Sequence, residues 1–344
     1  MRLGHDEIAR VRQGRPFGWP FFLRGFNMDK PFKTIEEQVD ILESRGVSTD
    51  ADTAGILERE GYYSVVNGYK DLFLDLDASK AAGHDVYVEG TSFSDIYRLF
   101  TFDRELRLTM FRYFAEAEAV LKTVCAYKIS EAHQDEPEPY LNPGNYRQDR
   151  RHRQLVDSFI DDLKIILHKP PHQDGSFKRD YIEHYALKHD GVPLWVLTNF
   201  LMLGQTFKLY DYQPDLVKNA IARCFSDLYE ETHQGRKRIG TRQLRLAYDH
   251  IKDFRNICAH DERLYCARVS PSSDISFAAM LDDMELVLTR EEHKRMLRDV
   301  LLLVTGLVGD LDSRHAIAVT KSMGINDLTK TFAPTIADLQ DDIR

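Results

Sequence analysis

The chain has 344 residues, 43% of them hydrophobic and 29% charged, so it can bury a large core as one elaborate domain or two smaller ones. Its formal net charge is −9, which excludes a polycation that coats nucleic acid with its whole surface. Any nucleic-acid site must be a local basic patch. No signal peptide is visible, and the longest apolar run, residues 300–308, is too short to span a bilayer. We therefore expect a cytoplasmic protein without a membrane partner.

Cysteine and histidine spacing gives no sign of a metal site. No two cysteines form a Cys-x-x-Cys pair, and we expect reduced thiols at Cys125, Cys224, Cys258 and Cys266. His168, His172, His184 and His189 lie close together, but the lysines and prolines around them are typical of a solvated loop. The expectation is that the protein uses neither a metal nor a cofactor.

The first 90 residues predict an arm followed by a small cap. Residues 1–29 form a basic, aromatic arm, and residues 30–90 form a cap subdomain. Thr34 and Glu37 have the spacing of a capping box and predict a helix that ends at Gly46. A second short helix is expected over residues 52–60. The aromatic stretch 62–69 contains an Asn-Gly signal, which favours a small hairpin or an irregular aromatic knot.

From residue 94 onward the apolar residues fall at helical spacing, which predicts a helical domain over residues 91–312. The first helix should be very long, covering some 35 residues, or two nearly continuous ones. Residues 265–285 hold apolar residues among serines and prolines and suggest a short extended insertion. Residues 313–344 are expected to be a C-terminal tail. The predicted fold class is mostly α, a helical bundle with a small N-terminal helical and aromatic cap. Further helices are expected at 155–167, 178–188, 194–210, 214–229, 241–260 and 290–311.

The most informative stretch places Arg255, Asn256 and His260 at the end of the helix predicted from residue 241. Asn256 and His260 are four residues apart, so they stack on one helix face, and the long Arg255 side chain can reach the same groove. A guanidinium, an amide and an imidazole together suit a site that holds phosphate and moves protons. The bare Arg-x4-His spacing occurs four times in the chain. The alternative is a helix that ends in polar residues, with His260 near the negative end of the helix dipole and Arg255 in a surface ion pair.

A run of cations precedes this constellation. Between residues 236 and 255 there are seven cations, Arg255 included, against two acids. In an acidic chain this predicts a positive ridge that attracts a phosphate backbone. The expected RNA-binding residues are Arg236, Lys237, Arg238, Arg242, Arg245 and Lys252.

These residues resemble a known signature. Arg255-Asn256-x3-His260 followed by Arg263-Leu264-Tyr265 is similar to the HEPN domains of the Abi-like family, the AbiD/AbiF phage abortive-infection proteins. Other similar segments occur in the same order across residues 30–268, namely Lys30-Pro31-Phe32-Lys33-Thr34, Tyr62-Tyr63, Phe102-Asp103-Arg104-Glu105-Leu106-Arg107 and Pro193-Leu194-Trp195-Val196.

The resemblance implies a HEPN-type helical bundle and a metal-independent endoribonuclease whose site is completed by two protomers of a homodimer. It also implies a role in phage defence or in a toxin–antitoxin system. Arg255, Asn256 and His260 would be the catalytic set. Glu116 and Glu118 lie where the family's long helix carries acids, and either could orient Arg255. Asp261 stands where relatives often have a second histidine, and it could orient or acidify His260.

Two other interpretations remain open from the sequence. One is a non-catalytic HEPN module that binds RNA, including a small regulatory RNA, or another protein. The other is a member of a toxin–antitoxin pair that an antitoxin partner controls by modification near the motif.

Overall fold

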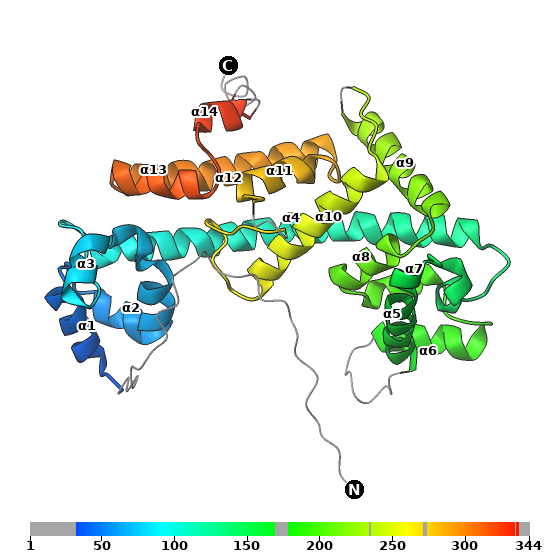
Figure 1. Cartoon of the computed structure of the whole chain (residues 1–344), viewed down its shortest axis with the longest axis horizontal. Helices are drawn as coiled ribbons and strands as arrows, with labels where there is room; N and C mark the ends of the chain where they lie inside the picture. The colour runs from blue at the N-terminus through cyan, green and yellow to red at the C-terminus, as the bar shows by residue number, and fades with distance from the viewer. Residues whose placement is uncertain (1–31, 169–177, 234, 271–273, 334, 337–344) are drawn as a thin grey trace, which may run out of the picture. The chain divides into compact units, whose positions relative to one another are not determined.

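The computed structural model describes residues 32–168, 178–233, 235–270, 274–333 and 335–336 (Figure 1). Within these ranges the named elements are all helices, and extended pairing is limited to two isolated bridges, Ser48 with Ser92 and Leu74 with Tyr87. The mostly α fold predicted from the sequence is therefore confirmed. The predicted arm, residues 1–29, and His172 lie outside the described residues.

Among the described residues, the first of two compact units comprises 32–96, 268–270 and 274. Its first helix begins with the predicted capping box: the Thr34 hydroxyl accepts the N–H of Glu37, and the Glu37 carboxylate accepts the N–H of Thr34. The stretch 62–69 forms a π-helical turn over Tyr63–Asn67 instead of a hairpin. The other elements are α1 (Ile35–Ser44), α2 (Thr53–Glu60), a 3₁₀ turn (Lys70–Phe73) and α3 (Leu76–Ala82).

The second unit comprises the described residues of the ranges 97–267 and 275–336. The predicted long helix is one continuous element of 40 residues, α4 (Phe93–Ala132), whose first four residues belong to the first unit. The remaining helices are α5 (Arg150–His168), α6 (Lys178–Lys188), α7 (Leu194–Leu197), α8 (Leu203–Asp211), α9 (Asp215–Thr232), α10 (Thr241–Ala259), α11 (Phe277–Glu285), α12 (Arg290–Asp310), α13 (Ser313–Ser322) and α14 (Leu328–Thr331).

The core of the second unit fixes α10 against α4. Tyr248 of α10 is fully buried, and its hydroxyl donates to the backbone carbonyl of Ala117 in α4 at 2.9 Å. The Tyr248 ring also meets Phe225 of α9 edge to face, with 5.8 Å between the ring centroids. A buried tyrosine that satisfies its hydroxyl in this way anchors both the position and the rotation of its helix. The end of α10 is consequently held at a defined place along α4.

The structure differs from the sequence prediction in two places in this unit. The helix expected over residues 194–210 is broken into α7, a 3₁₀ turn (Thr198–Phe200) and α8. The Asn199 amide donates to the carbonyl of Trp195 at 2.9 Å, and such side-chain bonds compete with a regular helix. The expected extended insertion, residues 265–285, contains α11 instead, because Phe277, Met280, Leu281 and Met284 recur at helical spacing and are all buried.

The stretch expected to be a tail also contains helices. α13 and α14 lie within residues 313–344, and Val319 and Phe332 in these segments are fully buried. Burial of large apolar side chains ties this part of the chain to the second unit.

Candidate functional site

Helix α10 carries the candidate residues and stops just after them. Its buried face is apolar, with Leu244, Tyr248, Ile251 and Phe254 spaced for one side of a helix. His260 is the residue that caps its C-terminus, and the N–H of Glu262 donates to the carbonyl of Ile257 at 3.0 Å. The residue between them, Asp261, has a φ of 57°, in the left-handed region. This is the Schellman way of ending a helix, with aspartate where glycine or asparagine is usual.

A buried ion pair on α4 holds the chain that follows His260. The Asp103 carboxylate accepts the backbone N–H groups of Leu264 at 3.1 Å and Tyr265 at 2.8 Å, and it also pairs with Arg107 at 2.7 Å. Arg107 in turn bonds the Asp261 carboxylate at 2.5 Å. The side chains of Asp103 and Arg107 are 0% and 5% exposed, so both charges depend on these bonds. These bonds fix the position of the C-terminal end of α10 along α4.

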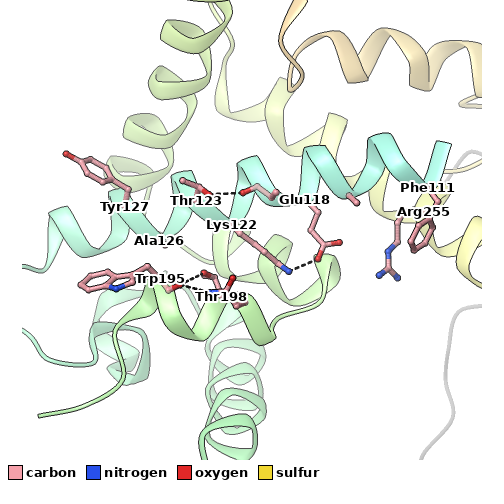
Figure 2. A pocket seen from close by; sticks show the side chains of 12 residues that line it. Phe111, Glu118, Lys122, Thr123, Ala126, Tyr127, Trp195, Thr198 and Arg255 are labelled. Carbon is pink, nitrogen blue, oxygen red and sulfur yellow. Dashed lines mark hydrogen bonds and ion pairs between the residues drawn. The ribbon is translucent and has the colours of Figure 1, made fainter. Parts of the chain in front are cut away.

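Arg255 lies beside α4 in a groove (Figure 2). Its guanidinium carbon is 5.5 Å from the centroid of the Phe111 ring, a cation–π contact. Among the described residues Arg255 has no acidic partner, unlike the surface ion pair that the alternative interpretation expects. The guanidinium therefore keeps its hydrogen-bond donors available for an anion.

Asn256 and His260 lie elsewhere on the same helix. Both are exposed. The backbone N–H of His260 donates to the carbonyl of Asn256 at 3.0 Å, but within the described residues no hydrogen bond joins their side chains to each other or to that of Arg255. Five residues along a helix correspond to about 140° of rotation, so the Arg255 and His260 side chains leave α10 in different directions. Within a single chain, the three candidate side chains therefore do not come together in one site.

The three supporting acids have separate partners. Glu118 bonds Lys122 at 2.7 Å and lines the groove that Arg255 also lines. Glu116 is on the other side of α4, near Arg112 at 3.5 Å and Arg295 of α12 at 3.9 Å. The Asp261 carboxylate is bonded to Arg107 rather than to His260. Of these acids, Glu118 is the one that shares a groove with Arg255.

The basic run before the motif is largely neutralised within the molecule. Arg238 and Arg242 are exposed and have no acidic partner among the described residues. They lie near the start of α10, and the rise of a helix puts Arg242 about 20 Å from Arg255. The remaining four cations form ion pairs, Arg236 with Glu230, Lys237 with Glu285, Arg245 with Asp211, and Lys252 with Asp249 and Asp253. The predicted ridge therefore offers isolated guanidinium groups rather than a continuous positive surface.

Cys258, inside the motif, is poorly suited to act as a nucleophile. Burial raises the pKa of its thiol to about 12, so the thiolate is scarce at neutral pH. All four cysteines are free thiols. In the described part of the chain, no cluster of three or more histidine, cysteine, aspartate or glutamate side chains could hold a metal ion.

Sequence reasoning missed the ion pair of Asp103 with Arg107 and the groove that Phe111 and Trp195 line together with Arg255. The first two belong to the segment 102–107, whose resemblance to the family was noticed without any role for its charges. A signal was present: an aspartate and an arginine four residues apart on the apolar side of a helix need partners when buried. Phe111 and Trp195 carried no such signal, because exposed aromatic residues are common.

Comparison with known proteins gives one family. The family model described as Abi-like protein matches residues 55–266, which is more than half of the chain and includes Arg255 and His260. No curated protein and no solved structure shows significant similarity to the chain. Within the described residues, none of the helices has the length and apolar character needed to cross a membrane.

Proposed function

The chain belongs to the Abi-like family, and from that premise we propose that it serves phage defence as a metal-independent endoribonuclease acting in the cytoplasm. The cutting site would be composite, formed by the motif regions of two copies. Arg255, Asn256 and His260 are the proposed catalytic residues. A toxin–antitoxin arrangement, in which a partner protein or RNA silences the enzyme, fits the same chemistry.

The observation that carries this proposal is the state of Arg255. It lines a groove of the surface and is supported by an aromatic ring instead of an acid. An arginine with a purely structural role usually forms an ion pair with a carboxylate. An arginine that binds phosphate keeps its N–H groups available for the ligand. Family membership and this availability support the same conclusion independently.

The proposed reaction is an internal transfer within RNA. A base removes the proton from a ribose 2′-OH, the oxygen attacks the adjacent phosphorus, and the bond to the 5′-oxygen breaks as an acid protonates that oxygen. The products are a 2′,3′-cyclic phosphate and a 5′-hydroxyl. Each positioned acid or base typically contributes about 10²- to 10⁴-fold. Imidazole suits both roles near neutral pH.

The reaction needs two proton-transfer groups, a base and an acid, whereas the motif of one chain contains one histidine. A two-fold dimer supplies His260 twice. Arg255 would stabilise the extra negative charge of the five-coordinate phosphorus, and Asn256 would hold a phosphate oxygen or fix the imidazole. The exposure of Asn256 and His260 and their separation from Arg255 within one chain support such a shared site.

The test compares wild type with Arg255→Ala and His260→Ala on end-labelled RNA in the presence of EDTA. We expect wild type alone to form cyclic-phosphate ends and to leave DNA of the same sequence intact, because DNA lacks the attacking hydroxyl. Equal cutting by all three proteins would remove these residues from the reaction.

A second candidate is a non-catalytic module that binds RNA or protein. The observation that favours it is that, among the described residues, no hydrogen bond joins the side chains of Arg255, Asn256 and His260 to one another. Such a module retains RNA in a filter-binding assay and releases no cyclic-phosphate products, whereas the enzyme does both.

A further inference from the structure

A groove runs along α4 from Arg255 to the 3₁₀ turn that follows α7. Its volume is about 680 Å³, and one wall is a single face of α4 between Phe111 and Tyr127. These two residues are 16 positions apart, so the rise of the helix makes the groove about 24 Å long. The opposite wall near Tyr127 is formed by Trp195, Thr198 and Asn199. We call this feature the α4 groove.

The far end of the α4 groove carries two large exposed rings. The side chains of Tyr127 and Trp195 are 62% and 58% exposed, and Figure 2 shows them at the end opposite Arg255 and Phe111. The Tyr127 hydroxyl and the Trp195 indole N–H have no hydrogen-bond partner among the described residues. Single exposed rings are common, but these two line the same groove, and apolar surface gathered in one place is characteristic of a binding site.

Between its two ends the groove is lined by alanines, a threonine and one ion pair, and its net charge is slightly positive. The Lys122 ammonium and the Glu118 carboxylate form an ion pair midway along it, as the dashed line in Figure 2 shows. With Arg255 at one end, the charged lining residues sum to one positive charge, in a chain whose net charge is −9. A ligand with flat apolar faces and a negative backbone matches aromatic rings at one end and a free guanidinium at the other.

We propose that the α4 groove is a subsite for single-stranded RNA, in which bases stack on Trp195 and Tyr127 and the backbone continues to Arg255. The inference rests on the proposed ribonuclease function and adds the class of substrate. Unpaired bases expose the π-faces that aromatic side chains need, whereas a duplex keeps them stacked inside. The enzyme would therefore cut single-stranded regions.

The same features do not suit a second copy of the chain in this groove. In a two-fold contact the same patch lies on both sides, so a hollow opposite its own copy leaves a void. Such a contact would also bury the Glu118–Lys122 pair, whose desolvation is costly. The proposed dimer would meet beside Asn256 and His260 and leave the α4 groove open.

Trp195 gives a direct test, because the chain has two tryptophans and the Trp19→Phe variant leaves Trp195 as the single tryptophan, which can be excited selectively over tyrosine. The full-length variant is titrated with a short 2′-O-methylated oligoribonucleotide, which has no free 2′-OH and is not cut. We expect saturable quenching of Trp195 fluorescence, and much weaker quenching by the duplex of the same sequence. Equal quenching by the duplex would overturn the inference.

The contribution of each ring is measured by substitution and fluorescence anisotropy of a labelled oligonucleotide. Trp195→Ala should raise the Kd by about 5- to 150-fold, the effect expected from losing one stacked base, and Tyr127→Ala should act similarly. Trp195→Phe should keep most of the affinity, whereas Trp195→Leu, which is apolar but has no π-face, should not. The matched control is Phe32→Ala, which removes a more exposed aromatic ring in the first unit.

The outcomes separate this inference from the ribonuclease proposal. If Arg255→Ala abolishes cutting while Trp195→Ala changes neither Kd nor KM, the subsite is wrong and the ribonuclease stands. If Trp195→Ala weakens binding but the wild type yields no cyclic-phosphate ends, the subsite stands and the catalysis fails. If Trp195→Ala alters only the sedimentation of the protein, the groove is a contact between copies and the inference is overturned.

Discussion

Asp103 and Leu264 lie 161 residues apart in the chain, yet the Asp103 carboxylate accepts the backbone N–H of Leu264 at 3.1 Å. This bond joins the long helix α4 to the segment that follows the motif. Because Tyr265 and Arg107 bind the same carboxylate, one buried side chain sets the course of the chain beyond His260. The segment 102–107 and the segment 263–265 therefore depend on each other physically.

Asp103→Ala should be strongly destabilising. The substitution removes the buried carboxylate that pairs with Arg107, and it leaves the backbone N–H groups of Leu264 and Tyr265 without the acceptor that they share. We expect the free energy of unfolding to fall by about 3–5 kcal/mol, as measured by urea denaturation. The control is Glu105→Ala, an exposed acid two positions away, which should stay within about 0.5 kcal/mol of wild type. A loss below about 1 kcal/mol for Asp103→Ala would contradict the structure.

Asp261 should tolerate glycine but not valine. Its φ of 57° costs a β-branched residue about 1–2 kcal/mol, whereas glycine adopts it freely. We expect Asp261→Val to lower the melting temperature and Asp261→Gly to leave it nearly unchanged, since the lost bond to Arg107 offsets the relief of strain. RNA cutting should survive Asp261→Gly, because the carboxylate is bonded to Arg107 and not to His260. Loss of cutting at full stability would show that Asp261 acts on His260 after all.

His260→Ala should be dominant over wild type if both copies of His260 serve one site. Co-expression of differently tagged chains with a threefold excess of mutant gives about one sixteenth wild-type dimers by random pairing of subunits. Activity per total protein should then drop to about one sixteenth, rather than to the one quarter expected when each chain cuts alone. Phe32→Ala in place of the mutant is the control and should leave the activity unchanged.

The stability of the protein should fall as the solution becomes mildly acidic. Burial lowers the pKa of His293 below its ordinary 6.5, with a smaller upward influence from its hydrogen bond to the Leu281 carbonyl and from nearby Glu285. Burial likewise lowers the pKa of His233. Above pH 6.5 both histidines are neutral in the folded and unfolded chain, and below it the unfolded chain takes up protons first.

The measurement is the free energy of unfolding at pH 7.5 and pH 5.5. His293→Gln should reduce the difference between the two values, even though it lowers both through lost packing. His84→Gln, at an exposed position in the first unit, should leave the difference as in wild type. An unchanged difference in His293→Gln would mean that this imidazole is not the group that titrates.

Helix positions were largely predictable because burial imposes a period that the sequence displays. The capping box at Thr34 and Glu37 located the start of α1, and apolar spacing located α4, α10 and α12. The sequence did not predict the break after α7, because this break depends on the hydrogen bond that the side-chain amide of Asn199 makes. The sequence did not predict α11 either, because its apolar face is short and the serines and prolines before it suggested an irregular segment.

The sequence predicted where along the chain the site lies, but not how its side chains are arranged in space. Adjacent residues indicated Arg255, Asn256 and His260, but not that Arg255 would rest on Phe111. The positive ridge was overestimated because its partners are remote in sequence: Glu285 is 48 residues from Lys237, and Asp211 is 34 residues from Arg245. Counting charges along a chain assumes that each charge remains unpaired. Whether it does depends on the ion pairs that form when the chain folds.

The internal pairing of those cations also governs how the protein would meet a polyanion. With most of the ridge neutralised, the field at low ionic strength is, at distances larger than the spacing of these ion pairs, that of an acidic body of charge −9. RNA approaching from afar is repelled, and attraction begins only when it reaches the separate guanidinium groups. Moderate salt should therefore speed the encounter, the reverse of the kinetics shown by basic proteins that capture nucleic acid over long range.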